Sequence, residues 1–217
     1  MHDGGCMRSI AVVSQKGGSG KSTLSVHLAV AALRTGQKVA IIDTDPQGSS
    51  AAWGDSREAD EPAVVSIAAD DLTSALAEAR SEGFDVVIID TQPRASASLA
   101  NIVQAADFAL IPIRPSAFDV ATAEQTQRIA TAASTPFAFV LNECPNRAPE
   151  IAESRAVLAQ LGLVLDVTIG ERRIYGRALQ TGLAVQEFEP NSDAAREIER
   201  AWSEIERRSS AHAIVAV

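Results

Sequence analysis

The sequence predicts an α/β fold, with a mostly parallel β-sheet and helices on both of its faces. Apolar runs of strand length alternate with helical patterns along the chain, which is typical of repeated βα units. The chain is 46% hydrophobic but only 4% aromatic. Ala, Val, Ile and Leu must therefore build the core, as in sheets covered on both faces. A length of 217 residues is enough for one such domain.

Strands are predicted where apolar and β-branched residues run consecutively, as in Val86-Val87-Ile88-Ile89. The predicted strands are residues 10–14, 38–43, 64–67, 84–90, 108–113, 137–142 and 164–168. Helical patterns between them predict helices over residues 22–35, 71–81, 95–106, 120–133 and 150–161, with a last helix over 193–208. Gly36 and Gly162 stand where two of these helices should stop, and Ser192 or Asp193 stands where the last should begin.

We expect a single domain over residues 8–210, after a disordered lead-in of residues 1–7 and before a tail of residues 211–217. The net charge is −9, so the protein as a whole does not attract nucleic acid or anionic membranes, and DNA binding requires a local basic patch. Cys6 and Cys144 have neither metal-ligand spacing nor a disulfide framework. No stretch approaches the ~20 apolar residues of a membrane span, and signal-peptide features are missing, which predicts a cytoplasmic protein.

A glycine-rich loop between the first predicted strand and helix is the main chemical signal. Its glycines let consecutive backbone N–H groups surround phosphate oxygens, and the helix N-terminus adds positive potential. Lys21 is placed to reach the β- and γ-phosphates of ATP, and the Ser22 hydroxyl is a natural Mg²⁺ ligand. The alternative is a glycine-rich turn with an exposed lysine, but glycines, lysine, hydroxyl and element order agree on a phosphate site. The predicted ATP-binding residues are Gly17, Gly18, Ser19, Gly20, Lys21, Ser22 and Thr23.

Lys16 occupies the place where the usual phosphate loop has a glycine. Lys16-Gly17-Gly18-Ser19-Gly20-Lys21-Ser22-Thr23 resembles the deviant Walker A motif of the ParA/MinD family, P-loop ATPases with an α/β fold. The resemblance implies that Lys16 reaches across an ATP-bound homodimer to the phosphates held by the partner subunit. A second cation there would stabilise the transition state as an arginine finger does. The alternative is a lysine that ends a strand in solvent.

Three carboxylates follow predicted strands at the edge where open α/β sheets bind ligands. Asp43-Thr44-Asp45-Pro46-Gln47 resembles the second signature of the family. The match implies that Asp45 orients or activates the attacking water and that Asp43 supports the magnesium shell; alone, the segment would be an ordinary turn. Asp90 ends an apolar strand in the form of a Walker B segment and is the predicted Mg²⁺ residue. Family members commonly continue with a small residue and two prolines, whereas this chain reads Thr91-Gln92-Pro93, so the behaviour of this second switch stays open.

Further binding residues come from the resemblance. Asn142 stands where family members contact adenine, although alone it could equally be a turn residue. Arginines near the C-terminus fall where ParA proteins bind DNA non-specifically, and backbone binding of this kind needs no base-reading residues. The alternative is a set of solvated arginines that balance Glu171, Glu197 and Glu199. The predicted DNA-binding residues are Arg172, Arg173, Arg177 and Arg196.

The resemblance implies an ATPase, weak alone and stimulated by a ParB-like or other small adaptor protein. Its ATP-bound dimer would bind DNA in the nucleoid and release it on hydrolysis, thereby segregating plasmid or chromosomal DNA or positioning a cargo such as carboxysomes. The chain is most similar in type to small plasmid ParA proteins without an N-terminal helix-turn-helix. Membrane cycling of the MinD type is disfavoured because residues 207–217 are weakly amphipathic and lack Lys, Phe and Trp, so no stable membrane association is expected. A metabolic P-loop enzyme on the same scaffold is a further alternative.

Overall fold

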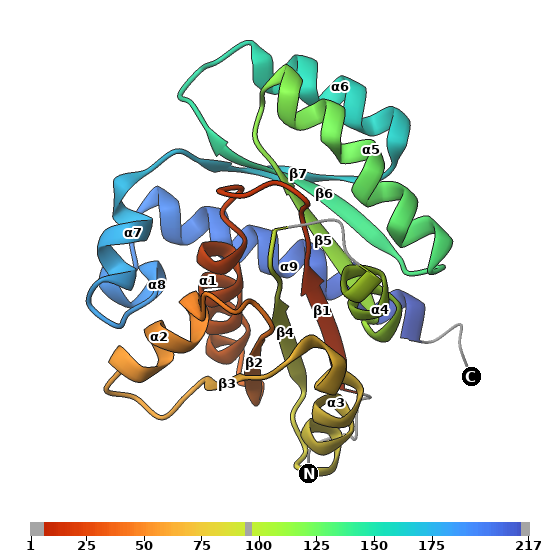
Figure 1. Ribbon diagram of the computed structural model, residues 1–217. Coiled ribbons are helices and arrows are strands. Elements are labelled where there is room, and N and C mark those ends of the chain that lie inside the picture. Colours follow the sequence, from red (N-terminus) through yellow and green to blue (C-terminus); the bar gives the residue numbers. More distant parts are fainter. Residues whose placement is uncertain (1–6, 94–96, 214–217) are drawn as a thin grey trace.

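The computed structural model describes residues 7–93 and 97–213, in which one parallel sheet has the strand order β3-β2-β4-β1-β5-β6-β7 (Figure 1). All the predicted strands are confirmed, with ends that differ by two residues or fewer. The strands are β1 (Arg8–Val12), β2 (Val39–Asp43), β3 (Ala63–Ser66), β4 (Val86–Asp90), β5 (Phe108–Ile113), β6 (Phe137–Cys144) and β7 (Val164–Gly170).

Helices cover both faces of the sheet, as predicted. Helices α1, α2, α7, α8 and α9 pack on one face, and α3, α4, α5 and α6 pack on the other (Figure 1). Side chains of β4 alternate between these two cores and are fully buried. The helices are α1 (Lys21–Arg34), α2 (Ser49–Ser56), α3 (Leu72–Ser81), α4 (Ala97–Ala105), α5 (Ala117–Ala132), α6 (Glu150–Leu161), α7 (Arg173–Leu179), α8 (Val185–Phe188) and α9 (Asp193–Ala213).

Three of these helices, α2, α7 and α8, were not predicted. They are short, and a short helix contains too few turns to show an apolar periodicity. The longer helices are all confirmed with small shifts at their ends. Ser192 provides the predicted cap of α9, because its Oγ accepts the backbone N–H of Ala195 at 3.1 Å.

The ends of the chain refine the expected boundaries. Met7 is buried in the core, while residues 1–6 of the predicted lead-in lie outside the described residues. Helix α9 continues to Ala213 and so includes the first residues of the predicted tail; 214–217 lie outside the described residues. Within the described ranges, no helix combines the length and the apolarity that crossing a membrane would require.

Strand order places a crevice at the carboxyl end of β1. Its neighbour β4 leads to α4 on one face of the sheet, whereas β1 itself leads to α1 on the other. The loops that follow these strands therefore separate. In open α/β sheets, ligands bind at such a point.

Candidate nucleotide site

The loop between β1 and α1 has the shape of a phosphate cradle. Gly18 and Gly20 have φ angles of 71° and 80°, a region that favours glycine. Glycine is also required at both positions because neighbouring side chains approach the backbone closely. A Cβ at Gly18 would lie 2.9 Å from Nη2 of Arg114, and a Cβ at Gly20 would collide with the side-chain amide of Asn142. The loop is thus shaped by its own glycines and enclosed by side chains of Arg114, directly after β5, and of Asn142 on β6.

Lys21 begins α1 with its side chain folded back over the loop. Its Nζ donates to the backbone carbonyl of Lys16 at 3.4 Å, and the residue is buried. Burial lowers the pKa of the Lys21 ammonium group, and the nearby charges of Asp90 and Asp45 oppose that shift. The ammonium group therefore lies between the loop and the carboxylates, where a bound triphosphate would meet it.

Lys16 does not end in open solvent. Its Nζ forms an ion pair with Oδ1 of Asp119, a buried residue in the first turn of α5. Asp119 is held in turn by the Ser116 hydroxyl, which donates to its Oδ2 at 2.6 Å. Asp119 was missed in the sequence because nothing local marks a carboxylate about a hundred positions away as the partner of this lysine. To reach a second subunit, Lys16 must leave Asp119.

Asp43 organises the start of α2. It is fully buried, and its Oδ2 accepts the backbone N–H groups of Ser50 at 2.9 Å and Ala51 at 3.0 Å. Its Oδ1 accepts the backbone N–H of Asp45 at 3.0 Å. A carboxylate at a helix N-terminus satisfies free N–H groups and interacts favourably with the helix dipole. These bonds make Asp43 a support for the turn, and its place in a magnesium shell stays a prediction.

Asp90 is paired in register with Asp43 on the neighbouring strand. Burial raises the pKa of the Asp90 carboxyl to about 6, while the nearby hydroxyls of Ser50 and Ser22 oppose the shift. The Ser50 hydroxyl donates to Oδ2 at 2.7 Å, whereas the buried Oδ1 has no hydrogen-bond partner among the described residues. A free carboxylate oxygen beside the Ser22 hydroxyl fits a hard divalent cation such as Mg²⁺. Ser50 was not predicted, because only strand register and helix α2 bring it to Asp90.

Asp45 lies on the turn that links β2 to α2. Its Oδ1 accepts the backbone N–H of Gln47 at 2.9 Å, and its charge acts on Lys21. The carboxylate is only partly buried, so water reaches it beside the phosphate loop. The second predicted switch is described only in part: Pro93 lies near Gly17 of the loop, whereas residues 94–96 are outside the described residues.

A cavity of about 440 Å³ opens beside α1, between the end of β6 and α7. Asn142 lies on its wall, and its Nδ2 donates to the backbone carbonyl of Ser19 at 2.9 Å. One function of Asn142 is therefore to hold the phosphate loop; its predicted contact with the base would fall to the Oδ1 atom. The next residue, Glu143, has a left-handed φ of 51° at an irregularity between β6 and β7. Strained backbone of this kind is common at ligand sites, and the cavity has the size of a small-molecule pocket.

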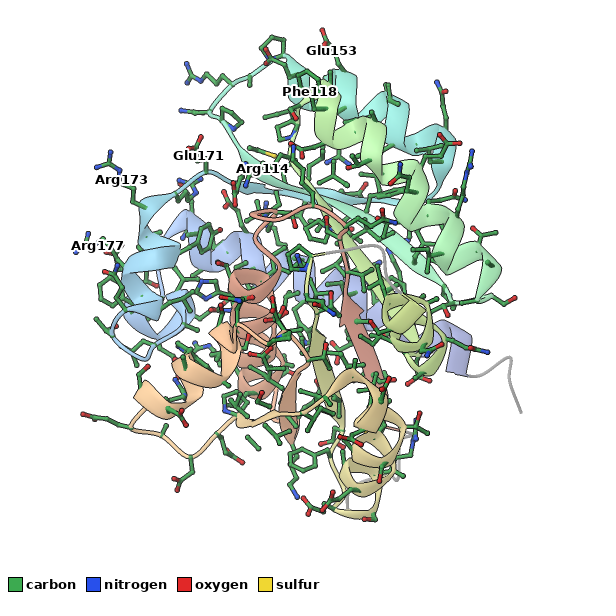
Figure 2. The ribbon with its side chains drawn as sticks, viewed as in Figure 1. Arg114, Phe118, Glu153, Glu171, Arg173 and Arg177 are labelled. Carbon is green, nitrogen blue, oxygen red and sulfur yellow. The ribbon has the colours of Figure 1, made fainter. Side chains whose placement is uncertain are left out.

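Arg114, at the end of β5, is a site residue that the sequence did not reveal. Its Nε lies 2.9 Å from Oε2 of Glu143, and its guanidinium group lies against Gly18. Burial raises the pKa of the Glu143 carboxyl, and the charge of Arg114 opposes that shift. Figure 2 shows Arg114 above the loop, between Phe118 on one side and Glu171 on the other.

The predicted DNA-binding arginines divide into two kinds. Arg172 lies 2.6 Å from Glu197, and Arg196 lies 2.6 Å from Asp193, so their charges are largely neutralised within the chain. Arg173 and Arg177 are exposed and form no ion pair with any described residue. Figure 2 shows both pointing outward from α7. Arg173 and Arg177 therefore present unpaired charge at the surface of the described residues.

Helices α7 and α8 are fastened to the two helices that begin at the nucleotide loop and its carboxylates. Arg57, directly after α2, donates to both carboxylate oxygens of Glu187 at 2.8 and 2.6 Å. Nδ1 of His27, on α1, accepts the backbone N–H of Val185 at 3.2 Å. Helix α8 thus contacts α1 and the end of α2. On α7, which carries Arg173 and Arg177, the Tyr175 ring lies 5.2 Å from the His27 ring.

Together, the fold and the loop define a P-loop nucleotide-binding protein. The family model described as the CobQ/CobB/MinD/ParA nucleotide binding domain matches residues 10–69. The chain is 32% identical over 210 residues to the maintenance of carboxysome distribution protein A of Gloeobacter kilaueensis, covering 90% of this chain and 95% of that relative. It is 30% identical over 209 residues to the protein of the same name from Halothiobacillus neapolitanus, covering 91% and 95%.

A solved structure shares the fold. The ATP complex of an McdA variant from Cyanothece matches with a TM-score of 0.72 at 19% identity, covering 94% of this chain and 96% of that chain. The chain belongs to the ParA/MinD family of P-loop ATPases. The family and the fold class predicted from the sequence are thereby confirmed.

Proposed function

We propose that this protein is a partition or positioning ATPase. Its ATP-bound homodimer binds DNA non-specifically, and adaptor-stimulated hydrolysis releases it. The observation that supports the proposal is that Lys16 lies in the loop, with its carbonyl bonded to Nζ of Lys21 and its own Nζ paired with Asp119. Released from Asp119, the Lys16 side chain would extend to a second chain. The relatives named for carboxysome distribution support a positioned cargo of that kind.

The chemistry follows from the residues around the loop. The loop N–H groups and Lys21 bind the phosphates, and Asn142 keeps the loop in shape. Ser22 and Asp90 would hold Mg²⁺, which supplies neutralising charge to the phosphate oxygens. Asp45 orients the attacking water, and the partner's copy of Lys16 stabilises charge that develops in the transition state. Hydrolysis by one subunit thus requires the other.

DNA binding is assigned to Arg173 and Arg177, which have no acidic partner among the described residues. A dimer doubles the number of phosphate contacts, which increases both affinity and salt dependence. The ATP state therefore resides on the nucleoid, and a ParB-like or other small adaptor returns the protein to the cytoplasm by stimulating hydrolysis. Formation of the dimer, and not a new site, switches DNA binding on.

Two substitutions test this cycle. Asp45→Ala should retain ATP and accumulate as a DNA-bound dimer, because binding is intact and the water is no longer oriented. Lys16→Ala should retain ATP as a monomer but lose dimerisation and stimulated turnover. Lys38→Ala, at the opposite edge of the sheet and bonded to the Glu82 carbonyl, is the control and should behave as the parent. Light scattering with and without ATP, combined with DNA retention, measures all three; a strictly monomeric Asp45→Ala protein at saturating ATP would contradict the proposal.

A further inference from the structure

Phe118 is the most exposed large apolar side chain among the described residues. Its exposure is 83%, against 46% for Val157, 45% for Val65 and 38% for Leu163. A single exposed apolar residue is ordinary, but an almost completely exposed phenylalanine beside a functional site is not. We propose that Phe118 packs against a second copy of this chain and anchors the ATP-dependent dimer. The inference rests on the proposed function and names a contact that dimerisation requires.

The turn that carries Phe118 is held by hydrogen bonds. Ser116 caps α5: its Oγ accepts the backbone N–H of Asp119 at 3.2 Å, while its own backbone N–H donates to the Arg114 carbonyl at 2.8 Å. Pro115 further restricts the approach to the helix. Phe118 therefore projects from a fixed position without support from the core. Because the surrounding turn is already ordered, burying the ring against a partner would cost little conformational entropy.

The position of Phe118 identifies its partner. The next residue, Asp119, holds Lys16, and Arg114 at the start of the same segment lies against Gly18. Figure 2 shows Arg114 and Phe118 along the same rim of the molecule. A second subunit close enough to receive Lys16 at its phosphates must therefore cover the first turn of α5. Its surface would then bury the Phe118 ring.

The chemistry of this surface also fits a dimer of identical chains. In a two-fold symmetric interface the same residue is used on both sides, so one aromatic side chain contributes twice. Aromatic residues are enriched at interface centres, where a polar rim surrounds them. On the same segment as Phe118, Asp119 pairs with Lys16 and Arg114 pairs with Glu143. The segment thus combines one apolar anchor with a polar border.

The test is the dimer dissociation constant with Mg²⁺ and a non-hydrolysable ATP analogue, measured by analytical ultracentrifugation. Phe118→Ala should raise it roughly 30-fold or more, because each protomer loses an anchor. Phe118→Leu should remain within about 5-fold of the parent, since a large apolar group is kept. Val157→Ala, an exposed apolar change on the middle of α6, is the matched control and should leave it unchanged. Analogue binding by the dilute monomer and the thermal unfolding midpoint should match the parent in every variant.

The outcomes separate the two proposals. If Phe118→Ala dimerises as the parent does, this inference is overturned while the proposed function stands. If Phe118→Ala keeps the dimer but loses stimulation by the adaptor, the surface belongs to the adaptor and the inference is likewise overturned. If the parent protein stays monomeric with the analogue, both the proposed function and this contact are contradicted. Weakened dimerisation confined to Phe118→Ala, restored in Phe118→Leu, supports the anchor.

Discussion

The nucleotide site and the arginine face of α7 hold their charges in opposite ways. Asp43, Asp90 and Lys21 are buried, and each side chain makes at least one hydrogen bond within the chain. Arg173 and Arg177 are exposed and free of ion pairs with described residues. A buried charge interacts strongly with one nearby group. Exposed charges interact weakly because water and salt screen them, so several are needed for a strong effect. The first region suits catalysis and the second suits binding to a regular phosphate backbone.

A continuous set of contacts joins these regions. At the start of α2, the backbone N–H of Ser50 donates to Asp43 and the Ser50 hydroxyl donates to Asp90. Directly after the end of α2, Arg57 donates to Glu187 on α8. Gly182, in the turn between α7 and α8, touches the last residue of α2: a Cβ there would lie 2.6 Å from the carbonyl of Ser56. The arginine face is therefore supported by the helix that starts at the candidate metal site. Substitutions in the nucleotide site, in the arginine face and in the contacts between them should therefore have different effects on turnover, stability and DNA binding.

The largest effect is expected within the nucleotide site. Lys21→Ala removes a buried cation from the phosphates, and turnover with Mg²⁺ and ATP should fall by at least about 10³-fold. Steady-state phosphate release measures it. Circular dichroism should show an unchanged fold, because the Lys21 side chain makes only one hydrogen bond to the described residues, a long one to Lys16. Turnover within tenfold of the parent would mean that this loop does not hold the transferred phosphoryl group.

The contact between His27 on α1 and Val185 on α8 should make the stability of the protein depend on pH. Burial lowers the pKa of His27 to about 3, opposed by the Tyr175 backbone and the charge of Glu187. Between about pH 6.5 and 3, the unfolded chain binds a proton on His27 that the folded chain does not, so the free energy of unfolding falls as pH falls, by up to about 5 kcal/mol. His27→Asn keeps an acceptor for Val185 but does not titrate. Urea unfolding across this window should show a flatter pH dependence in the variant; parallel curves would refute the assignment.

The ion pair between Arg57, directly after α2, and Glu187 should show how much stability is lost when a buried cation has no partner. The Arg57 side chain is 3% exposed, and Glu187→Gln should lower the free energy of unfolding by about 3 kcal/mol. Replacing both residues by methionine should restore most of that stability, because an apolar pair of similar volume avoids desolvated charge. Chemical denaturation compares the two variants. Equal destabilisation by the single and double changes would show that packing, and not charge, joins the helices.

The smallest effect is expected on the arginine face. Reversing Arg173 and Arg177 to glutamate should weaken DNA binding by the ATP-bound dimer about 10- to 100-fold, and the salt dependence should fall by about one unit for each DNA phosphate that is no longer neutralised. Basal ATP turnover should stay at the parental value. Arg196→Glu is the control, because Arg196 already pairs with Asp193, and its effect should be within about twofold. Filter binding at several salt concentrations measures these differences. If Arg196→Glu weakened DNA binding as much as the reversal of Arg173 and Arg177, paired and unpaired arginines would not differ in their contribution.

The sequence alone predicted the seven strands, the longer helices and the phosphate loop, because these depend on local patterns. Apolar runs report strands, glycines report a backbone that needs left-handed φ angles, and Lys21 and Ser22 follow the loop at fixed spacing. Asp90 was found for the same reason, since it ends an apolar strand. Helices α2, α7 and α8 were not predicted, because so few residues cannot show the apolar periodicity of a helix.

Only the tertiary structure decided which side chains meet. Strand register brings Asp43 beside Asp90, and the turn into α5 brings Asp119 to Lys16 across a gap in sequence that no pattern spans. It also divides the predicted DNA-binding arginines, since Arg172 finds Glu197 on α9 while Arg173 remains free of ion pairs with described residues. Residue type and spacing determine what chemistry is available. Partners far apart in the chain determine where each charge acts, because ionic and hydrogen-bond contacts depend on distance in space and not on distance in sequence.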